Sequence, residues 1–336
     1  TNDTTNLLIR ADYNNAASNS TIQFQVDTAV ALTLDSSQNA TFAGTVAGTS
    51  FNGIPFFTDV ANRSMYTHNV SGTDDNAVDN TAYGFTAMDA ITTGDKNVAI
   101  GFQAGSAINT GSDNTILGAY AGDAITTGTA NIAIGRSALG AEDTHSGNIA
   151  IGYQALTVQN AGADAYNVAI GHQAGLNVST GALNTIVGGL AGDALTTGGN
   201  NTAVGHEALS TEDTGARNTA IGEGSLKTLN FDGNGYNTAV GYNSGHLMGT
   251  GVQNTIMGGL AGDALTTGSD NVAVGYQALS AEDTGGRSVA IGRAALGAQN
   301  NDANNYNVAV GYNAGHQVTT GVKNTITGGL AGDAVT

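Results

Sequence analysis

The sequence predicts an all-β protein built as a parallel β-solenoid, and three observations support this. A five-residue phrase of Asn, a β-branched residue, Ala or Ile, a mostly aliphatic residue and Gly recurs along the 336 residues. Successive copies start at a spacing of 17 or 19, which is too short for a βαβ unit. Units of this size cannot bury an apolar face alone, so they must stack on one another.

Fifteen copies define the rungs of the predicted solenoid, which spans 80–336 and ends inside an incomplete rung. The spacings follow a pattern of 17, 17, 17 and 19, so equivalent rungs repeat with a superperiod of 70. Rungs stacked at ~4.8 Å make a rod of roughly 70 Å. We number the places of a rung from its first residue. The rungs start at Asn80, Asn97, Asn114, Asn131, Asn148, Asn167, Asn184, Asn201, Asn218, Asn237, Asn254, Asn271, Ser288, Asn307 and Asn324.

Three places of the rung are nearly constant in residue type. Place five is always Gly, which indicates a turn with positive φ or a close approach between rungs. Place one suits a turn, and stacked Asn side chains can form an amide ladder. Place eight is Ala or Ser, which indicates a site too tight for larger side chains. Representative structural turn residues are Gly101, Gly118, Gly135 and Gly152, with Asn97, Asn114 and Asn131.

The strand of each rung is apolar on both faces. Places two and four share one face, because side chains alternate along a strand. Place three points to the other face and is Ala in eleven rungs and Ile in four. We expect one face to fill the coil and the other to be covered by further copies of the chain. The predicted interface residues at place three are Ile116, Ile186, Ile256 and Ile326.

Two regions precede the solenoid. Residues 1–50 form a small β-hairpin region, because apolar residues alternate over 22–26 and over 30–34, with Asp27 and Thr28 between them. A turn is expected at 36–39 and a third segment at 41–46. Residues 51–79 are either a linker or a degenerate first rung that caps the open strand edge.

Composition excludes several functions. Nine basic residues against 27 acidic ones give a net charge of -18, which argues against nucleic acid and anionic membranes. The absence of Cys excludes disulfides and thiol catalysis. No apolar run approaches the length of about 18 residues that a membrane span requires.

The titratable residues indicate no active site or cofactor. The Asp123-type residues and the Glu142-Asp143-type pairs recur once in each superperiod, whereas active sites are normally single constellations. We interpret them as solvated turn carboxylates rather than calcium ligands, and the six His as surface residues without metal spacing. The expectation is a protein that is not an enzyme and that holds no metal or cofactor.

The longer rungs, with a spacing of 19, are the main irregularity. Their extra length falls in 157–166, 227–236 and 297–306. Insertions in a solenoid bulge from one face, so these segments are either receptor-contact loops or spacers. The candidate contact residues are Tyr166, Phe231, Tyr236 and Tyr306.

Strings such as NVAIGFQAGSAINTGSDN and NVAVGYQALSAEDTGGRS resemble the head repeats of trimeric autotransporter adhesins, the YadA-like β-roll. The resemblance covers 80–336 and implies a left-handed roll and a parallel homotrimer. The family's usual repeat is shorter than the repeat of this chain, and it lacks the superperiod. The string TIQFQVDTAVALTLDSSQNATFAGTVAGTSFNG resembles a segment of bacteriophage tail fibres.

Together these features favour a non-enzymatic tail-fibre segment of a virion that reaches a glycan or protein receptor on a bacterial surface. The alternative is a bacterial surface adhesin of the trimeric autotransporter kind. A third class, an ice-binding solenoid, is disfavoured because Val98, Ile132 and others interrupt the Thr at place two.

Overall fold

The computed structural model describes the backbone of 8–11, 22–26, 29–34, 40–42, 50–51, 54–55, 57–59, 64–67 and 76–334, and the side chains of 64–67 and 76–334. The chain divides into two units, Thr1–Phe56 and Phe57–Thr336, each described by itself. The described residues form strands and turns and contain no helix. The predicted all-β solenoid is therefore confirmed, while its handedness stays a prediction.

The first unit contains a four-stranded antiparallel sheet in the order β1–β2–β3–β4. The predicted hairpin is confirmed, because Phe24 lies opposite Leu32 and Val26 lies opposite Ala29. The turn expected at 36–39 and residues 43–46 lie outside the described residues. The strands are β1 (Leu8–Ala11), β2 (Ile22–Val26), β3 (Ala29–Leu34) and β4 (Ala40–Phe42), followed by the antiparallel pair β5 (Ser50–Phe51) and β6 (Ile54–Pro55).

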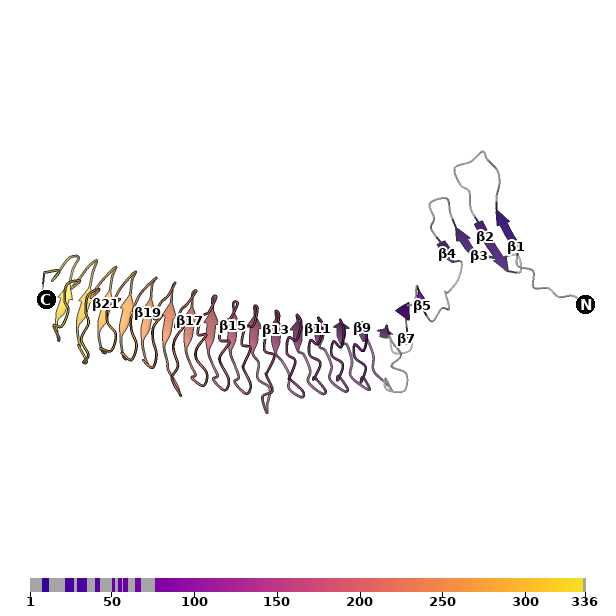
Figure 1. The fold of residues 1–336 in the computed structure, drawn as a ribbon, viewed down its shortest axis with the longest axis horizontal. Coiled ribbons are helices and arrows are strands. Elements are labelled where there is room, and N and C mark those ends of the chain that lie inside the picture. Colours follow the sequence, from indigo (N-terminus) through magenta and orange to yellow (C-terminus); the bar gives the residue numbers. More distant parts are fainter. Residues whose placement is uncertain are drawn as a thin grey trace, which may run out of the picture. The chain divides into compact units, whose positions relative to one another are not determined.

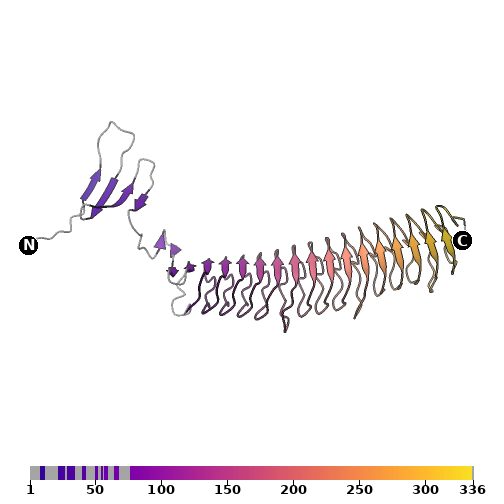
Figure 2. The same cartoon turned by 180° about the vertical axis from the view of Figure 1, so that it is seen from behind.

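The second unit is a stack of rungs whose strands form one parallel sheet (Figure 1, Figure 2). Each rung contributes one strand over places two to four, paired in register, as in Val98 opposite Thr115. The strands are β9 (Thr81–Tyr83), β10 (Val98–Ile100), β11 (Thr115–Leu117), β12 (Ile132–Ile134), β13 (Ile149–Ile151), β14 (Val168–Ile170), β15 (Thr185–Val187), β16 (Thr202–Val204), β17 (Thr219–Ile221), β18 (Thr238–Val240), β19 (Thr255–Met257), β20 (Val272–Val274), β21 (Val289–Ile291), β22 (Val308–Val310) and β23 (Thr325–Thr327).

The segment before β9 acts as an incomplete first rung, which favours the capping alternative. Strand β8 (Ser64–Tyr66) pairs in parallel with β9, and β7 (Phe57–Asp59) pairs antiparallel with β8. The hydroxyl of Ser64 accepts the N–H of Asn80 at 3.0 Å, as the place-one Asn does elsewhere. Tyr66 is buried in the core at the level of place three.

Each described rung from β9 to β23 has a single strand, over places two to four. Outside the strand the rungs still bond to each other: the N–H of Gln103 donates to the carbonyl of Phe85 at 3.0 Å, and that of Gly105 to Ala121 at 2.9 Å. Gln103 and Gly105, at places seven and nine, have φ of 55° and 54°. Left-handed residues at alternate positions prevent an extended strand there, because a strand needs negative φ throughout.

The core is narrow and lies inside the coil. Its side chains come from places one, three, eight and twelve, and from place nine where that residue is not Gly. In the rung of Asn97 the side chains of Ala99, Ala104 and Ile108 are fully buried. Small residues at place eight, and at place three in most rungs, leave room for one or two large side chains per level, such as Leu226 and Leu229.

Candidate functional site

The Asn at place one builds the predicted ladder by bonding to backbone. The side-chain oxygen of Asn80 accepts the N–H of Asn97 at 2.8 Å, and the Nδ2 of Asn97 donates to the carbonyl of Gly111 at 2.8 Å. Asn114 and Asn131 repeat the pattern, and these side chains are buried. Each amide satisfies backbone groups that the turn would otherwise leave unpaired.

The Gly at place five meets both conditions inferred from the sequence. Its φ is 137° in Gly101, 136° in Gly118, 127° in Gly135 and 138° in Gly152. A Cβ on Gly101 would lie 2.7 Å from the carbonyl carbon of Gly118, so stacked rungs leave no space for a side chain. Gly is therefore required for both conformation and close approach.

Place three does not face another copy of the chain, and this part of the prediction was wrong. Ile116, Ile186 and Ile256 are fully buried inside a single chain, and Ile326 is half-buried in the last rung. The central residue of each three-residue strand points inward, as the burial pattern of β10 shows. Place three therefore lines the inside of the coil, with Ala in eleven rungs and Ile in four.

The Ile at place three fills space left by Gly at place nine. A Cβ on Gly105 would come within 2.6 Å of Ile108, and one on Gly122 within 2.7 Å of Ile116. Where place nine is Leu, as in Leu139, place three of the same rung is Ala133. The superperiod thus reflects an alternation of two ways to fill the same core volume.

Three further places with positive φ in each rung were not predicted from the sequence. Besides place five, positive φ occurs at place seven, at place nine and at the residue before the next place one. Many of these residues are not Gly: Leu190 has φ of 56°, Leu139 of 52° and Asp113 of 59°. Each costs roughly 1–2 kcal/mol, and the inter-rung hydrogen bonds hold the backbone in place. Gly at place nine in eight rungs was a signal for positive φ, whereas the varied residues at place seven and before place one gave none.

The outward face of the solenoid sheet is uncharged, with a mostly aliphatic column at place four and Thr, Val or Ile at place two. Places two and four of every strand point away from the core and are partly or largely exposed. Ile100, Ile170 and Ile221 at place four are 37%, 37% and 38% exposed. The face runs from β9 to β23 (Figure 2). We call these two columns of residues the outer sheet face.

Aromatic and cationic side chains flank the outer sheet face at place six. Phe85 and Phe102 stack with ring centroids 6.1 Å apart, and Tyr153 stacks on His172 at 5.3 Å. Farther along, Arg293 lies 5.5 Å from the ring centroid of Tyr312. Such stacks order side chains along the rod, so the edge of the face has a defined shape.

The Glu of each Glu-Asp pair is buried, which corrects the expectation of a solvated carboxylate. Glu142, Glu212 and Glu282 are fully buried at place twelve, where neighbouring rungs carry residues such as Ile108 and Ile125. Backbone donors compensate in part: Glu212 accepts the N–H of Gly215 at 2.6 Å and Glu282 that of Gly285 at 2.7 Å. Burial nevertheless raises the pKa of Glu212.

The longer rungs fold back on these glutamates. The N–H of Phe231 donates to Glu212 at 3.2 Å, and its ring packs against the core, so Phe231 is not freely displayed. Tyr166, Tyr236 and Tyr306 are 56%, 51% and 47% exposed. The hydroxyls of the last two accept hydrogen bonds from Arg217 and Arg287, each at 2.6 Å. The segments therefore close over buried acids, and three of their four predicted contact residues remain accessible.

In rungs of 17 residues the Nδ2 of the place-one Asn donates to the carbonyl of place fifteen, as Asn97 does to Gly111. In the longer rungs the extra residues move that carbonyl away. The Nδ2 of Asn148 has no hydrogen-bond partner among the described residues. The Nδ2 of Asn218 instead donates to the carbonyl of Ala216 at 3.3 Å. The third of the longer rungs has Ser288 at place one, and its hydroxyl accepts from Gln299 at 3.0 Å. The single departure from Asn thus occurs where the amide lacks its usual acceptor.

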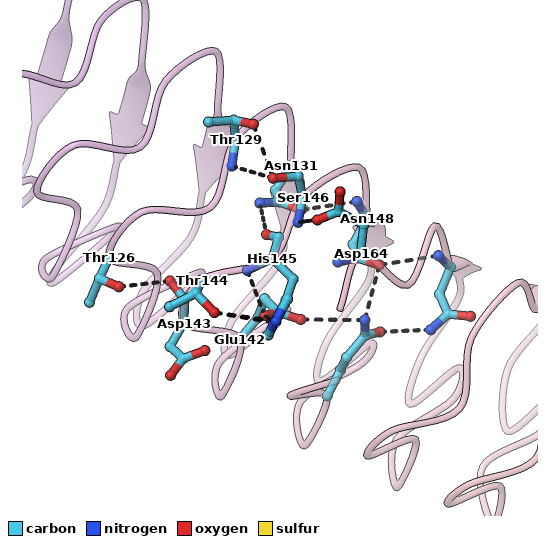
Figure 3. A network of polar contacts seen from close by, with 12 residues as sticks. Thr126, Thr129, Asn131, Glu142, Asp143, Thr144, His145, Ser146, Asn148 and Asp164 are labelled. Carbon is cyan, nitrogen blue, oxygen red and sulfur yellow. Dashed lines mark hydrogen bonds and ion pairs between the residues drawn. The ribbon is translucent and has the colours of Figure 1, made fainter. Parts of the chain in front are cut away.

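One turn gathers three metal-ligating residue types. The Nδ1 of His145 lies 2.9 Å from Oε1 of Glu142, and ligand atoms of Glu142, Asp143 and His145 all lie within 4.8 Å of one another. Figure 3 shows Glu142 and His145 meeting below Asn148, with Asp143 on the same turn. His145 is only 16% exposed, so it is not the surface residue that was expected.

The described part of the chain has no helix that could cross a bilayer. A scan against protein-family models and searches of curated proteins and solved structures returned no match to this chain. The argument for function therefore depends on the geometry above.

Proposed function

We propose that the chain is a structural segment of a homotrimeric tail fibre, in which the outer sheet faces of three parallel copies meet. The observation that carries this proposal is the exposed and mostly aliphatic place-four column of the outer sheet face. It repeats at every rung, and patches of such extent usually mark an interface. The two columns of this face contain no charged residue, although the chain has a net charge of -18, so this face is well suited to burial.

A second copy of the chain is the partner that fits best. Its rungs have the same rise, so a parallel copy repeats the same contact at every level without drifting out of register. Cyclic symmetry then brings equivalent residues together. The number three comes from the resemblance to YadA-like head repeats, and contact with a bacterial glycan or protein receptor comes from the resemblance to tail fibres.

Mass in solution tests the assembly. Wild-type chains should have the mass of a trimer by light scattering. The double variant Ile170→Asp with Ile221→Asp places six carboxylates at the contact, each costing several kcal/mol if buried unpaired. It should be a folded monomer by circular dichroism. Thr197→Asp with Thr267→Asp, at exposed residues away from the face, should stay trimeric. A monomeric wild type, or a trimeric Ile170/Ile221 variant, contradicts the proposal.

Immunogold labelling with antibodies to the chain distinguishes the tail fibre from the alternative, a bacterial trimeric adhesin. Label on virion fibres supports the proposal, and label on cell envelopes alone supports the adhesin.

The ice-binding alternative has one observation in its favour. Thr185, Thr202, Thr219, Thr238 and Thr255 at place two form an outward column in consecutive rungs. The adjacent column at place four is aliphatic. We therefore expect no thermal hysteresis from the purified assembly, and a clear hysteresis would favour ice binding.

A further inference from the structure

The turn at 142–145 differs from its two internal copies at one ligating residue. The three turns read Glu-Asp-Thr-His at 142–145, Glu-Asp-Thr-Gly at 212–215 and Glu-Asp-Thr-Gly at 282–285. In the second and third copies the Gly offers its backbone N–H to the buried Glu. In the first copy His145 offers both its backbone N–H, at 3.1 Å, and an imidazole nitrogen.

In the first copy Oε1 of the buried carboxylate accepts both contacts from His145, whereas the hydrogen bond to its Oε2 is the longest Oε2 bond of the three copies, against 3.2 Å from Phe231 to Glu212. Among the described residues, Oε2 of Glu142 receives one long hydrogen bond, at 3.4 Å from Gln159. Oε2 of Glu282 receives two short ones, at 2.9 Å from Gln299 and 2.7 Å from Asn305. The residue equivalent to Asn305 in the first copy is Ala165, which cannot donate from its side chain. A buried carboxylate oxygen with a single long hydrogen bond is suited to a positive partner.

We infer that Glu142, Asp143 and His145 bind a divalent transition-metal ion, with Zn²⁺ as the representative. One imidazole nitrogen and two carboxylate groups match the donors that Zn²⁺ takes in proteins. Donors at 2.0–2.2 Å from one ion lie at most about 4.4 Å apart. The ligand atoms of this turn lie within 4.8 Å of one another, so small side-chain rotations bring all three to one ion. Water completes the coordination.

The imidazole nitrogen also decides which ion the turn selects. Ca²⁺ and Mg²⁺ prefer oxygen ligands, and this turn offers too few of them. Coordination would use the Nδ1 of His145 in place of its present contact with Oε1 of Glu142, at 2.9 Å. The fold does not require the ion, since the turns at 212–215 and 282–285 form without a His.

Isothermal titration of the metal-free protein with ZnCl₂ in neutral buffer tests the site. We expect one ion per chain. His145→Gly, which installs the residue of the two sister turns, should lower the affinity at least tenfold while leaving the circular-dichroism spectrum unchanged. Asp143→Asn should also weaken binding, and the matched change Asp213→Asn should not. No Zn²⁺ uptake by the wild type, or unchanged stoichiometry and affinity in His145→Gly, overturns the assignment.

A thermal melt provides a second readout. Saturating Zn²⁺ should raise the melting temperature of the wild type, because a ligand that binds the folded state stabilises it. Neither Ca²⁺ with the wild type nor Zn²⁺ with His145→Gly should produce that shift. An equal shift with Ca²⁺, or an equal Zn²⁺ shift in the variant, would place binding elsewhere.

Discussion

Replacing one place-five Gly tests how tightly the rungs depend on their closest contact. Gly205 has φ of 137°, and a Cβ there would lie 2.5 Å from the carbonyl carbon of Gly222. Gly189 is the matched control: its φ is not positive, and the atom nearest to an added Cβ lies 3.6 Å away. The two substitutions add the same methyl group in neighbouring rungs.

The expected cost of Gly205→Ala has two parts. Holding Ala at this φ costs roughly 1–3 kcal/mol. Separating the rungs also weakens the hydrogen bonds from Gly205 to Val187, at 2.8 Å, and from Gly222 to Val204, at 2.7 Å. Each contributes about 0.5–1.5 kcal/mol. The total is about 2–6 kcal/mol, whereas Gly189→Ala should change stability by no more than about 1 kcal/mol.

Guanidinium unfolding followed by circular dichroism measures the difference. Because a solenoid is stabilised mainly by contacts between neighbouring rungs, hydrogen exchange should also show faster opening beside Gly205 than at distant rungs. Equal stability of the two variants would refute the assignment of place five to a strained close contact.

Three further predictions address the core, the ladder and the buried acids. Ile186→Asp should unfold the chain rather than dissociate folded copies, since the side chain is fully buried; circular dichroism distinguishes the outcomes. Asn201→Ala removes the acceptor of the Asn218 N–H and the donor to Gly215 and should cost about 2–5 kcal/mol in chemical denaturation; a change below about 1 kcal/mol would count against the ladder. Burial raises the pKa of Asp193 and Asp263 above the ordinary value of 3.8, so their contribution to stability is full below pH 3.8 and is lost as pH rises through the raised pKa. Replacing both by Asn should therefore raise the melting temperature more at pH 7 than at pH 3, and a pH-independent difference would contradict this.

The repeat made the architecture predictable, because Gly and Asn recur wherever the backbone has a fixed requirement. The orientation of the strand was not deduced, although a signal existed. Ile at place three, as in Ile186, occurs only where place nine of its own rung and of the preceding rung is Gly, as in Gly192 and Gly175. Residues whose volumes compensate in this way must share one interior, and place three therefore had to point inward.

The buried glutamates could also have been found by aligning the rungs. Glu142, Glu212 and Glu282 occupy the column of Ile108, Ile125 and Leu195, so acids replace core residues there. The cluster at 142–145 needed the structure, because the contact of His145 with Glu142 depends on side-chain rotamers that no spacing rule fixes. The left-handed residues at place seven had no signal either, since inter-rung hydrogen bonds override their intrinsic preferences.

The distance between identical residues in different copies tests the central claim most directly. The chain contains no Cys, so Thr115→Cys and Thr255→Cys, at place two of equivalent rungs two superperiods apart, each give a single spin-label site. A parallel, in-register trimer predicts the same short inter-label distance at both sites and a longer distance at the control Thr197→Cys. No intermolecular coupling, or clearly different distances at Thr115 and Thr255, would contradict the assembly of three parallel copies through the outer sheet face.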